Sequence, residues 1–132
     1  MKSVIIIRGV SGSGKSTFAH LLTEEDTICC ADDFFVNPFG EYIFDPKKLK
    51  AAHEYCKGKF LGLCMANAEK IVVANTNTSE WEFEEYEATA KKFGYYVFHV
   101  VLENRHGNKD IHGVPTEVKE KQKERLKNSL KL

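Results

Sequence analysis

The chain has little of what marks membrane, secreted or fibrous proteins. No apolar run exceeds four of its 132 residues, so neither a membrane span nor a signal peptide is expected. Proline occurs only three times, and no repeat or low-complexity tract is present. The 19 basic residues balance the 19 acidic ones, so any binding of nucleic acid needs a local patch rather than an overall positive field.

The cysteine and histidine patterns lack the spacing of a disulfide framework or a metal site. The four cysteines form no C-x-x-C pair, and two of them lie in an apolar, strand-like run. This pattern predicts buried, reduced thiols and a cytoplasmic protein. The five histidines show no metal-ligand spacing, so no structural metal is expected. With 42% hydrophobic and 29% charged residues, the sequence predicts one globular domain over residues 1–132.

Residues 9–16 match the complete phosphate-binding pattern G-x-x-x-x-G-K-[ST]. An apolar run precedes the loop and a helical stretch follows it, which is the context this motif requires. Backbone N–H groups in such a loop point inward and surround phosphates. The predicted nucleotide-binding residues are Gly9, Val10, Ser11, Gly12, Ser13, Gly14, Lys15, Ser16 and Thr17. Lys15 is expected at the terminal phosphates of ATP and the Ser16 hydroxyl on Mg²⁺.

Strand-like and helix-like segments alternate along the chain. Strands are expected at residues 4–7, 27–31, 70–74 and 95–102, and helices at 15–23, 45–69, 79–93 and 116–130. Alternation of this kind predicts an α/β fold of three layers, and the phosphate-binding motif at residues 9–16 assigns it to the phosphate-loop NTPase or kinase class. Its sheet has about four mostly parallel strands, with helices on both faces.

Polar clusters follow each of the predicted strands. They are the glycine loop, Asp32-Asp33, residues 75–77 and the polar loop 103–113. Ligands of parallel sheets bind beyond the carboxyl ends of the strands, so the four clusters are expected to form one site.

Asp32 and Asp33 are candidates for the base that takes a proton from an attacking hydroxyl. Adjacent residues on an extended chain point to opposite sides, so only one can serve fully. We favour Asp32, and assign Asp33 a structural or supporting role. The alternative is that one of them only caps a turn.

Other polar and aromatic residues are candidates for the acceptor side. Asn75 and Asn77 either orient water and substrate or cap the next helix, and both readings stay open. Tyr42 lies in an aromatic group with Phe34, Phe35, Phe39 and Phe44, on which a base could stack. At least half of these rings are expected to be buried, because aromatics are more often core residues.

Arg105 and Lys109 lie four residues apart in the polar loop, within a basic C-terminal region. On a mobile lid, they would neutralise charge that develops during phosphoryl transfer. The alternative is a solvated basic loop.

Several motifs together resemble a known family, the small phosphate-loop kinases grouped with phage-type polynucleotide 5′-kinases and their AAA-like ATP-binding relatives. The motifs are the glycine loop at 9–17, Ala-Asp-Asp-Phe-Phe at 31–35, Tyr-Ile-Phe-Asp at 42–45, Asn-Thr-Asn-Thr at 75–78, Asn-Arg at 104–105 and His-Gly-Val-Pro at 112–115. The resemblance implies an ATP- and Mg²⁺-dependent kinase acting on the 5′-hydroxyl of a nucleic acid. Asp32 would be its base, Lys15 and Ser16 would hold phosphate and metal, and Arg105 and Lys109 would be the lid cations.

The chain also departs from the phage-type pattern. Phe35 stands where those kinases carry an acceptor-side arginine, Ala31 replaces a basic residue, and Asn75 stands in place of an acid. Lys109 replaces a lid arginine, and a fifth strand is expected but not found by residue 132. Two alternatives therefore stay open. One is a kinase for a nucleoside or metabolite, and the other is a non-catalytic ATP-binding module completed by a partner or a second copy.

Overall fold

The computed structural model describes residues 1–10, 12–76, 80–103 and 116–130. Its centre is a sheet of four strands in the order β2-β3-β1-β4. The strands are β1 (Ser3–Arg8), β2 (Ile28–Cys29), β3 (Lys70–Ala74) and β4 (Tyr96–Val101). All pairings are parallel, so every carboxyl end lies at the same edge of the sheet, as the alternation of elements predicted.

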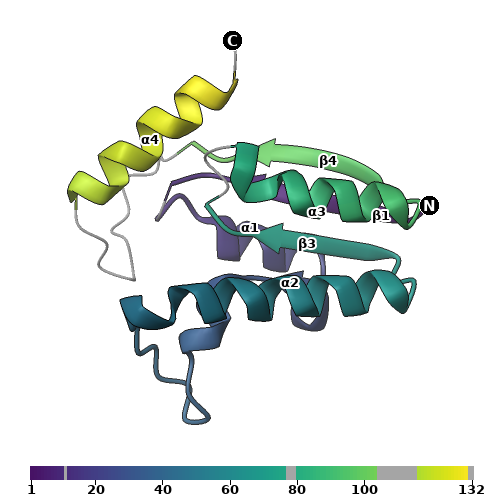
Figure 1. Ribbon diagram of the computed structural model, residues 1–132, viewed down its shortest axis with the longest axis horizontal. Helices are drawn as coiled ribbons and strands as arrows, with labels where there is room; N and C mark the ends of the chain where they lie inside the picture. Colours follow the sequence, from purple (N-terminus) through teal and green to yellow (C-terminus); the bar gives the residue numbers. More distant parts are fainter. Residues whose placement is uncertain (11, 77–79, 104–115, 131–132) are drawn as a thin grey trace.

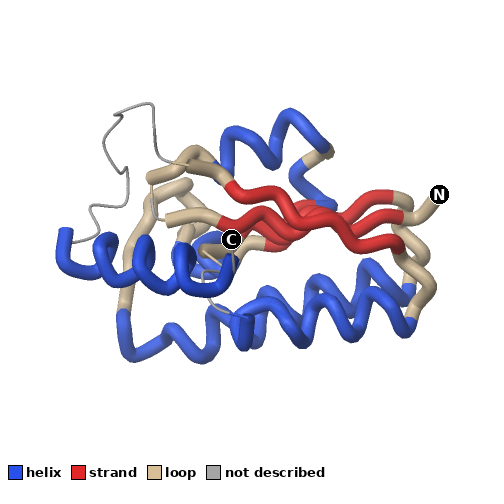
Figure 2. Tube along the Cα trace, turned by 90° about the horizontal axis from the view of Figure 1, so that it is seen from above, coloured by secondary structure: helices blue, strands red, loops and turns tan. Residues whose placement is uncertain are grey.

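Helices cover both faces of this sheet (Figure 2), which confirms the predicted three-layer α/β fold. Helix α1 (Lys15–Leu22) packs on one face, where Ala19 joins buried residues of β1 and β3. Helices α2 (Leu49–Met65) and α3 (Glu80–Lys92) cover the opposite face. Helix α4 (Thr116–Leu130) lies beyond the carboxyl ends of the strands (Figure 1).

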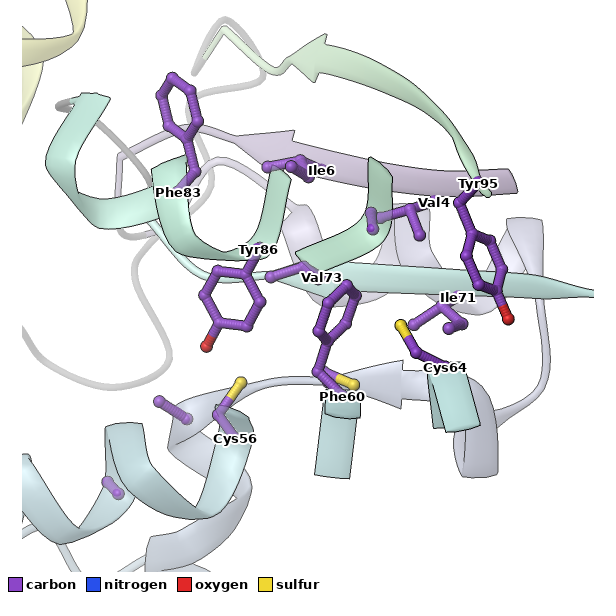
Figure 3. Close-up of a cluster of buried hydrophobic side chains, with 14 of the residues drawn as sticks. Val4, Ile6, Cys56, Phe60, Cys64, Ile71, Val73, Phe83, Tyr86 and Tyr95 are labelled. Carbon is purple, nitrogen blue, oxygen red and sulfur yellow. The ribbon is translucent and has the colours of Figure 1, made fainter. Parts of the chain in front are cut away.

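The larger core lies between the sheet and the α2–α3 layer (Figure 3). Phe60 of α2 and Tyr86 of α3 meet edge to face, with ring centroids 5.1 Å apart. Alternate residues of the inner strands face them, because successive side chains on a strand point to opposite faces. These strand residues are Val4, Ile6, Ile71 and Val73, all fully buried. Each such side chain contributes roughly 1.5–3 kcal/mol by leaving water.

Two predicted boundaries are wrong at their carboxyl ends. The second strand was expected to reach Ala31 but stops at Cys29, and residues 31–35 form the 3₁₀ helix η2 (Ala31–Phe35). The helix expected to reach residue 69 stops at Met65, two residues before Asn67 takes a left-handed conformation with φ 57°. The start of this helix differs as well: the 3₁₀ helix η3 (Pro46–Lys48) comes first, where the Asp45 carboxylate accepts from Lys47 N at 3.0 Å, and α2 follows at Leu49.

Candidate active site

The phosphate loop connects β1 to α1 at the carboxyl edge of the sheet. Gly12 and Gly14 have φ angles of 81° and 94°, in the left-handed region that favours glycine. Gly14 is the N-cap of α1, and its carbonyl accepts the first helical bond from Phe18 N at 2.9 Å. The first turn of α1 carries no acidic residue, so its positive end is available to an anion.

The loop is packed tightly where it leaves the strand. A Cβ at Gly9 would lie 2.5 Å from Ser13 Oγ and 3.0 Å from the Leu102 carbonyl oxygen. Glycine is therefore needed here for close approach rather than for its φ angle. Ser13 Oγ is buried and has no hydrogen-bond partner in the described part of the chain. An unsatisfied hydroxyl inside a glycine loop fits a site that is completed by a bound phosphate.

Lys15 and Ser16 begin α1 directly after this loop. The half-buried Lys15 ammonium donates to the Val10 carbonyl at 2.9 Å, within reach of the loop interior. Ser16 and Thr17 are exposed in the first turn of the helix. The donor set of loop N–H groups, one ammonium and one hydroxyl suits a nucleotide phosphate with Mg²⁺. Ser11, which belongs to the same predicted set, lies outside the described residues.

Hydrogen bonds tie the ends of β1, β3 and β4 together at this edge. Gly9 N donates to the Thr76 carbonyl at 2.9 Å, which joins the phosphate loop to the end of β3. Leu102 N donates to the Arg8 carbonyl at 2.8 Å and holds the end of β4 beside the same loop. The parallel pairing of β2 with β3 puts Asp32 and Asp33 at the same edge, so among the described residues three of the four predicted polar clusters converge there. Residues 104–113 of the fourth lie outside the described residues.

Asp32 and Asp33 both lie in η2, directly beyond β2. Asp32 is half-buried, and its Oδ1 accepts from the Tyr42 hydroxyl at 3.3 Å. Asp33 is exposed overall, but desolvation of its carboxyl raises the pKa of that group, and the charge of Lys59 partly offsets this effect. The contact of Tyr42 with Asp32 was not predicted, because the two residues are 10 positions apart in the sequence and no local pattern brings them together.

The Asn75 side chain joins the end of β3 to η2 and to α2 through two hydrogen bonds. Its Oδ1 accepts from Ala31 N at 2.9 Å, and its Nδ2 donates to Cys56 Sγ at 3.5 Å. The first contact satisfies the Ala31 N–H where the β2 ladder ends, which explains why that strand is shorter than expected. These bonds give Asn75 a structural role, and a role toward substrate stays a prediction. Asn77 lies outside the described residues.

The aromatic group near Asp32 is more exposed than predicted. Of its five rings, only Phe35 is buried, so the expectation that at least half are buried is wrong. Phe34 and Tyr42 are half-buried, while Phe39 and Phe44 are exposed. The physical reason is position: residues 36–45 form a loop that projects below the start of α2 (Figure 1), on the side away from the sheet.

Arg8 is a buried cation that the sequence reasoning missed. It ends β1 with 6% of its surface exposed, its guanidinium lies 4.5 Å from the Phe83 ring centroid, and it donates to Ser129 Oγ on α4. Helix α4 also buries Leu126. The sequence does contain a signal for this buried cation, because Arg8 directly follows the apolar run at residues 4–7. Arg105 and Lys109, the predicted lid cations, lie outside the described residues.

The thiols behave as core groups. Cys29, Cys56 and Cys64 are buried, and all four cysteines are free. Burial raises the pKa of the Cys30 thiol to about 12, so it stays protonated at neutral pH. The described residues contain no group of three side chains suited to holding a metal ion and no helix able to cross a membrane.

A family model described as an AAA domain matches residues 4–131. The chain belongs to this family. Human NEDD4-binding protein 2 is 36% identical over 98 residues, which cover 71% of the chain and 5% of that much longer protein. The uncharacterized protein PM0531 of Pasteurella multocida (strain Pm70) is 30% identical over 132 residues, covering 89% of the chain and 73% of the relative.

Solved structures share the fold of this AAA-family chain. A chain in the structure of the Pnkp1/Rnl/Hen1 RNA repair complex superposes with a TM-score of 0.73 at 21% identity, covering 98% of the chain but only 45% of that protein. The Mycobacterium tuberculosis APS kinase CysC (Cys556Ala mutant) superposes with a TM-score of 0.53 at 16% identity, covering 99% of the chain and 98% of that structure. The fold is thus that of phosphate-loop kinases, and the resemblance inferred from the motifs is confirmed.

Proposed function

We propose that this protein is an ATP-dependent kinase that transfers the γ-phosphoryl group to the 5′-hydroxyl of a nucleic acid. The observation that supports the proposal best is the position of Asp32. Its carboxylate lies beyond the carboxyl end of β2, at the same sheet edge as the phosphate loop, and is oriented by Tyr42. A base near the γ-phosphate is needed for transfer to a hydroxyl but not for nucleotide binding alone.

Each residue then has a distinct role. Asp32 accepts the hydroxyl proton while the acceptor oxygen bonds to the γ-phosphorus and the bond to the β-phosphate oxygen breaks, releasing ADP. Lys15 leaves the Val10 carbonyl for the β- and γ-phosphates. Ser16 would hold Mg²⁺, which neutralises phosphate charge when bound. Arg105 and Lys109 are proposed to stabilise the charge on the transferred group.

The proposal is tested by incubating the protein with γ-labelled ATP and Mg²⁺ against a panel of acceptors. The panel contains DNA and RNA oligonucleotides with a 5′-hydroxyl, the same oligonucleotides with a 5′-phosphate, and free nucleosides. Label is expected on the 5′-hydroxyl oligonucleotides only. Lys15→Ala is the control for contaminating kinase, because it removes the ammonium that contacts the phosphates. No labelled product with any acceptor would refute the kinase proposal.

Asp32→Asn tests the base. The amide keeps an oxygen that can accept from Tyr42, so the fold and ATP affinity are expected to remain, while transfer falls by roughly 10²–10⁴-fold. An Asp32→Asn protein with full activity would refute this assignment.

A small-molecule kinase is the second candidate. Phe35 is buried where a polynucleotide kinase of the phage type has an acceptor-side arginine, and the net charge of the chain is zero. The APS kinase that shares the fold acts, by its name, on a small acceptor. Labelling of a nucleoside that excess oligonucleotide does not inhibit would favour this candidate. The third is an ATP-binding module completed by a second copy or another protein, which would bind ATP and label no acceptor. The four free cysteines fit a cytoplasmic setting for all three.

A further inference from the structure

Exposed aromatic side chains gather beside the proposed acceptor side. Phe44 is 51% exposed and Tyr55 is 47% exposed, and Phe39, at the turn between Asn37 and Gly40, is 87% exposed. Single exposed hydrophobic residues are common, but three exposed rings within one loop and the adjoining helix are not.

Two of these rings are supported from behind. The Phe44 ring centroid lies 5.0 Å from that of Phe35, and the Tyr55 centroid lies 6.0 Å from that of Phe34. Phe34 and Phe35 contact each other edge to face at 5.4 Å. We call these four side chains the aromatic ridge. Because its inner members are packed, Phe44 and Tyr55 present ring surface to solvent without having to be ordered first.

The ridge leads to the proposed catalytic base. Phe35 contacts Tyr42 with ring centroids 6.1 Å apart, and the Tyr42 hydroxyl donates to Asp32. Backbone bonds fix the same segment: Ile43 N donates to the Phe35 carbonyl at 2.8 Å, and Val36 bridges Tyr42. A chain lying on the ridge would therefore end close to Asp32.

Positive charge flanks the ridge. Lys47, Lys48 and Lys50 follow Phe44 in sequence and are all exposed. Among the described residues, none of these three ammonium groups has a carboxylate within ion-pair distance, whereas Lys57 further along α2 pairs with Glu85. The acids of this segment are Asp45, whose carboxylate accepts from Lys47 N, and the exposed Glu41 and Glu54, so the three lysines supply positive charge locally and not a net positive field.

We propose that the aromatic ridge and these three lysines form a docking surface for single-stranded nucleic acid. The bases stack on Phe44 and Tyr55 while Lys47, Lys48 and Lys50 contact the phosphates. Unpaired cations beside exposed rings suit a polyanion with planar groups, since every base offers a face for stacking whatever its sequence. The proposal rests on the proposed function, because it makes the acceptor a polynucleotide and aims its end at Asp32.

Binding without chemistry tests the ridge. A decamer of thymidylate with a free 5′-hydroxyl and a fluorophore at its 3′ end is titrated with protein in the absence of ATP, and anisotropy is recorded. Phe44→Ala and Tyr55→Ala are each expected to weaken binding by about tenfold. Phe98→Ala is the matched control, because Phe98 is also 47% exposed but lies on β4, and it is expected to bind as the unchanged protein does.

The charge contribution is measured separately. Lys47→Gln and Lys48→Gln should each reduce the slope of log affinity against log salt by about 0.7, the value for one phosphate contact on a single strand. Tyr55→Ala keeps the test decisive if Phe44→Ala fails to fold, since Tyr55 is 47% exposed on the surface of α2.

The outcomes separate this proposal from the proposed function. Equal decamer affinity for all ridge variants would overturn the docking surface, as would a wild-type affinity for thymidine equal to that for the decamer. Ridge-dependent decamer binding without phosphorylation would support the docking surface and count against the kinase. If the decamer is phosphorylated and no ridge substitution changes its binding or phosphorylation, the result would support the kinase and count against the docking surface.

Discussion

A methyl group added at Gly9 would enter a crowded part of the phosphate loop. In Gly9→Ala the new Cβ meets Ser13 Oγ at 2.5 Å and the Leu102 carbonyl at 3.0 Å. The serine hydroxyl can rotate away, but the carbonyl belongs to the backbone next to β4 and is held by the sheet. The loop therefore has to move as a unit, by a few tenths of an ångström or more.

Two effects should follow from this displacement. Overpacking of a well-packed site costs about 1–3 kcal/mol, which in a chain of this size lowers the melting temperature by about 3–10 °C. The loop N–H groups also lose their alignment, and we expect ATP affinity to fall by about tenfold, equal to roughly 1.4 kcal/mol. Urea unfolding measures the first effect, and titration calorimetry with ATP and Mg²⁺ measures the second.

Gly58→Ala provides the matched control. It is the same chemical change in the exposed interior of α2, where a Cβ would meet no atom within 4 Å. Alanine there should raise stability by about 0.5–1 kcal/mol and leave ATP affinity unchanged. If Gly9→Ala unfolds at the wild-type urea midpoint and binds ATP as well as the wild type, the argument from crowding is incorrect.

Three further outcomes follow from buried contacts. Asn75→Ala leaves the Ala31 N–H unsatisfied and should lower the unfolding free energy, measured with urea, by about 1–3 kcal/mol. A decrease below about 0.5 kcal/mol would contradict the structural role of this hydrogen bond. Burial raises the pKa of Cys30 from 9.0 to about 12, so stability that is complete below pH 9 is lost toward pH 12. Between pH 8 and 10 the unfolding free energy should fall by about 1.4 kcal/mol for this thiol, and Cys30→Ala should flatten that decline. Arg8→Met removes the bond to Ser129 and should speed hydrogen exchange in α4, while unchanged exchange would refute that anchor.

Local chemistry explains why much of the fold could be predicted. The phosphate loop is specified by Gly12 and Gly14, whose left-handed φ angles favour glycine, and by Lys15 directly after them. Asp45 before Pro46 specifies a cap through residues that are neighbours in the chain. Strand positions followed from short apolar runs, and the parallel sheet followed from their alternation with helices.

Features that depend on distant residues were predicted poorly. Asn75 ends β2 by accepting a bond from a residue 44 positions away, and this shortened the strand. The exposure of Phe39 and Phe44 depends on what covers the edge of the sheet, which their own sequence does not encode. Arg8 can be buried because its guanidinium donates to Ser129 of α4 and lies over the Phe83 ring of α3.

The sequence by itself determined that the chain has a phosphate loop, that strands and helices alternate, and that acids follow the second strand. These properties arise from neighbouring residues, whose conformational preferences do not depend on the rest of the molecule. Only the tertiary structure decided which side chains meet: Tyr42 with Asp32, Asn75 with Ala31, and Phe35 with Phe44. Those meetings depend on packing between segments far apart in the chain, because burial, pKa and charge pairing are set by neighbours in space.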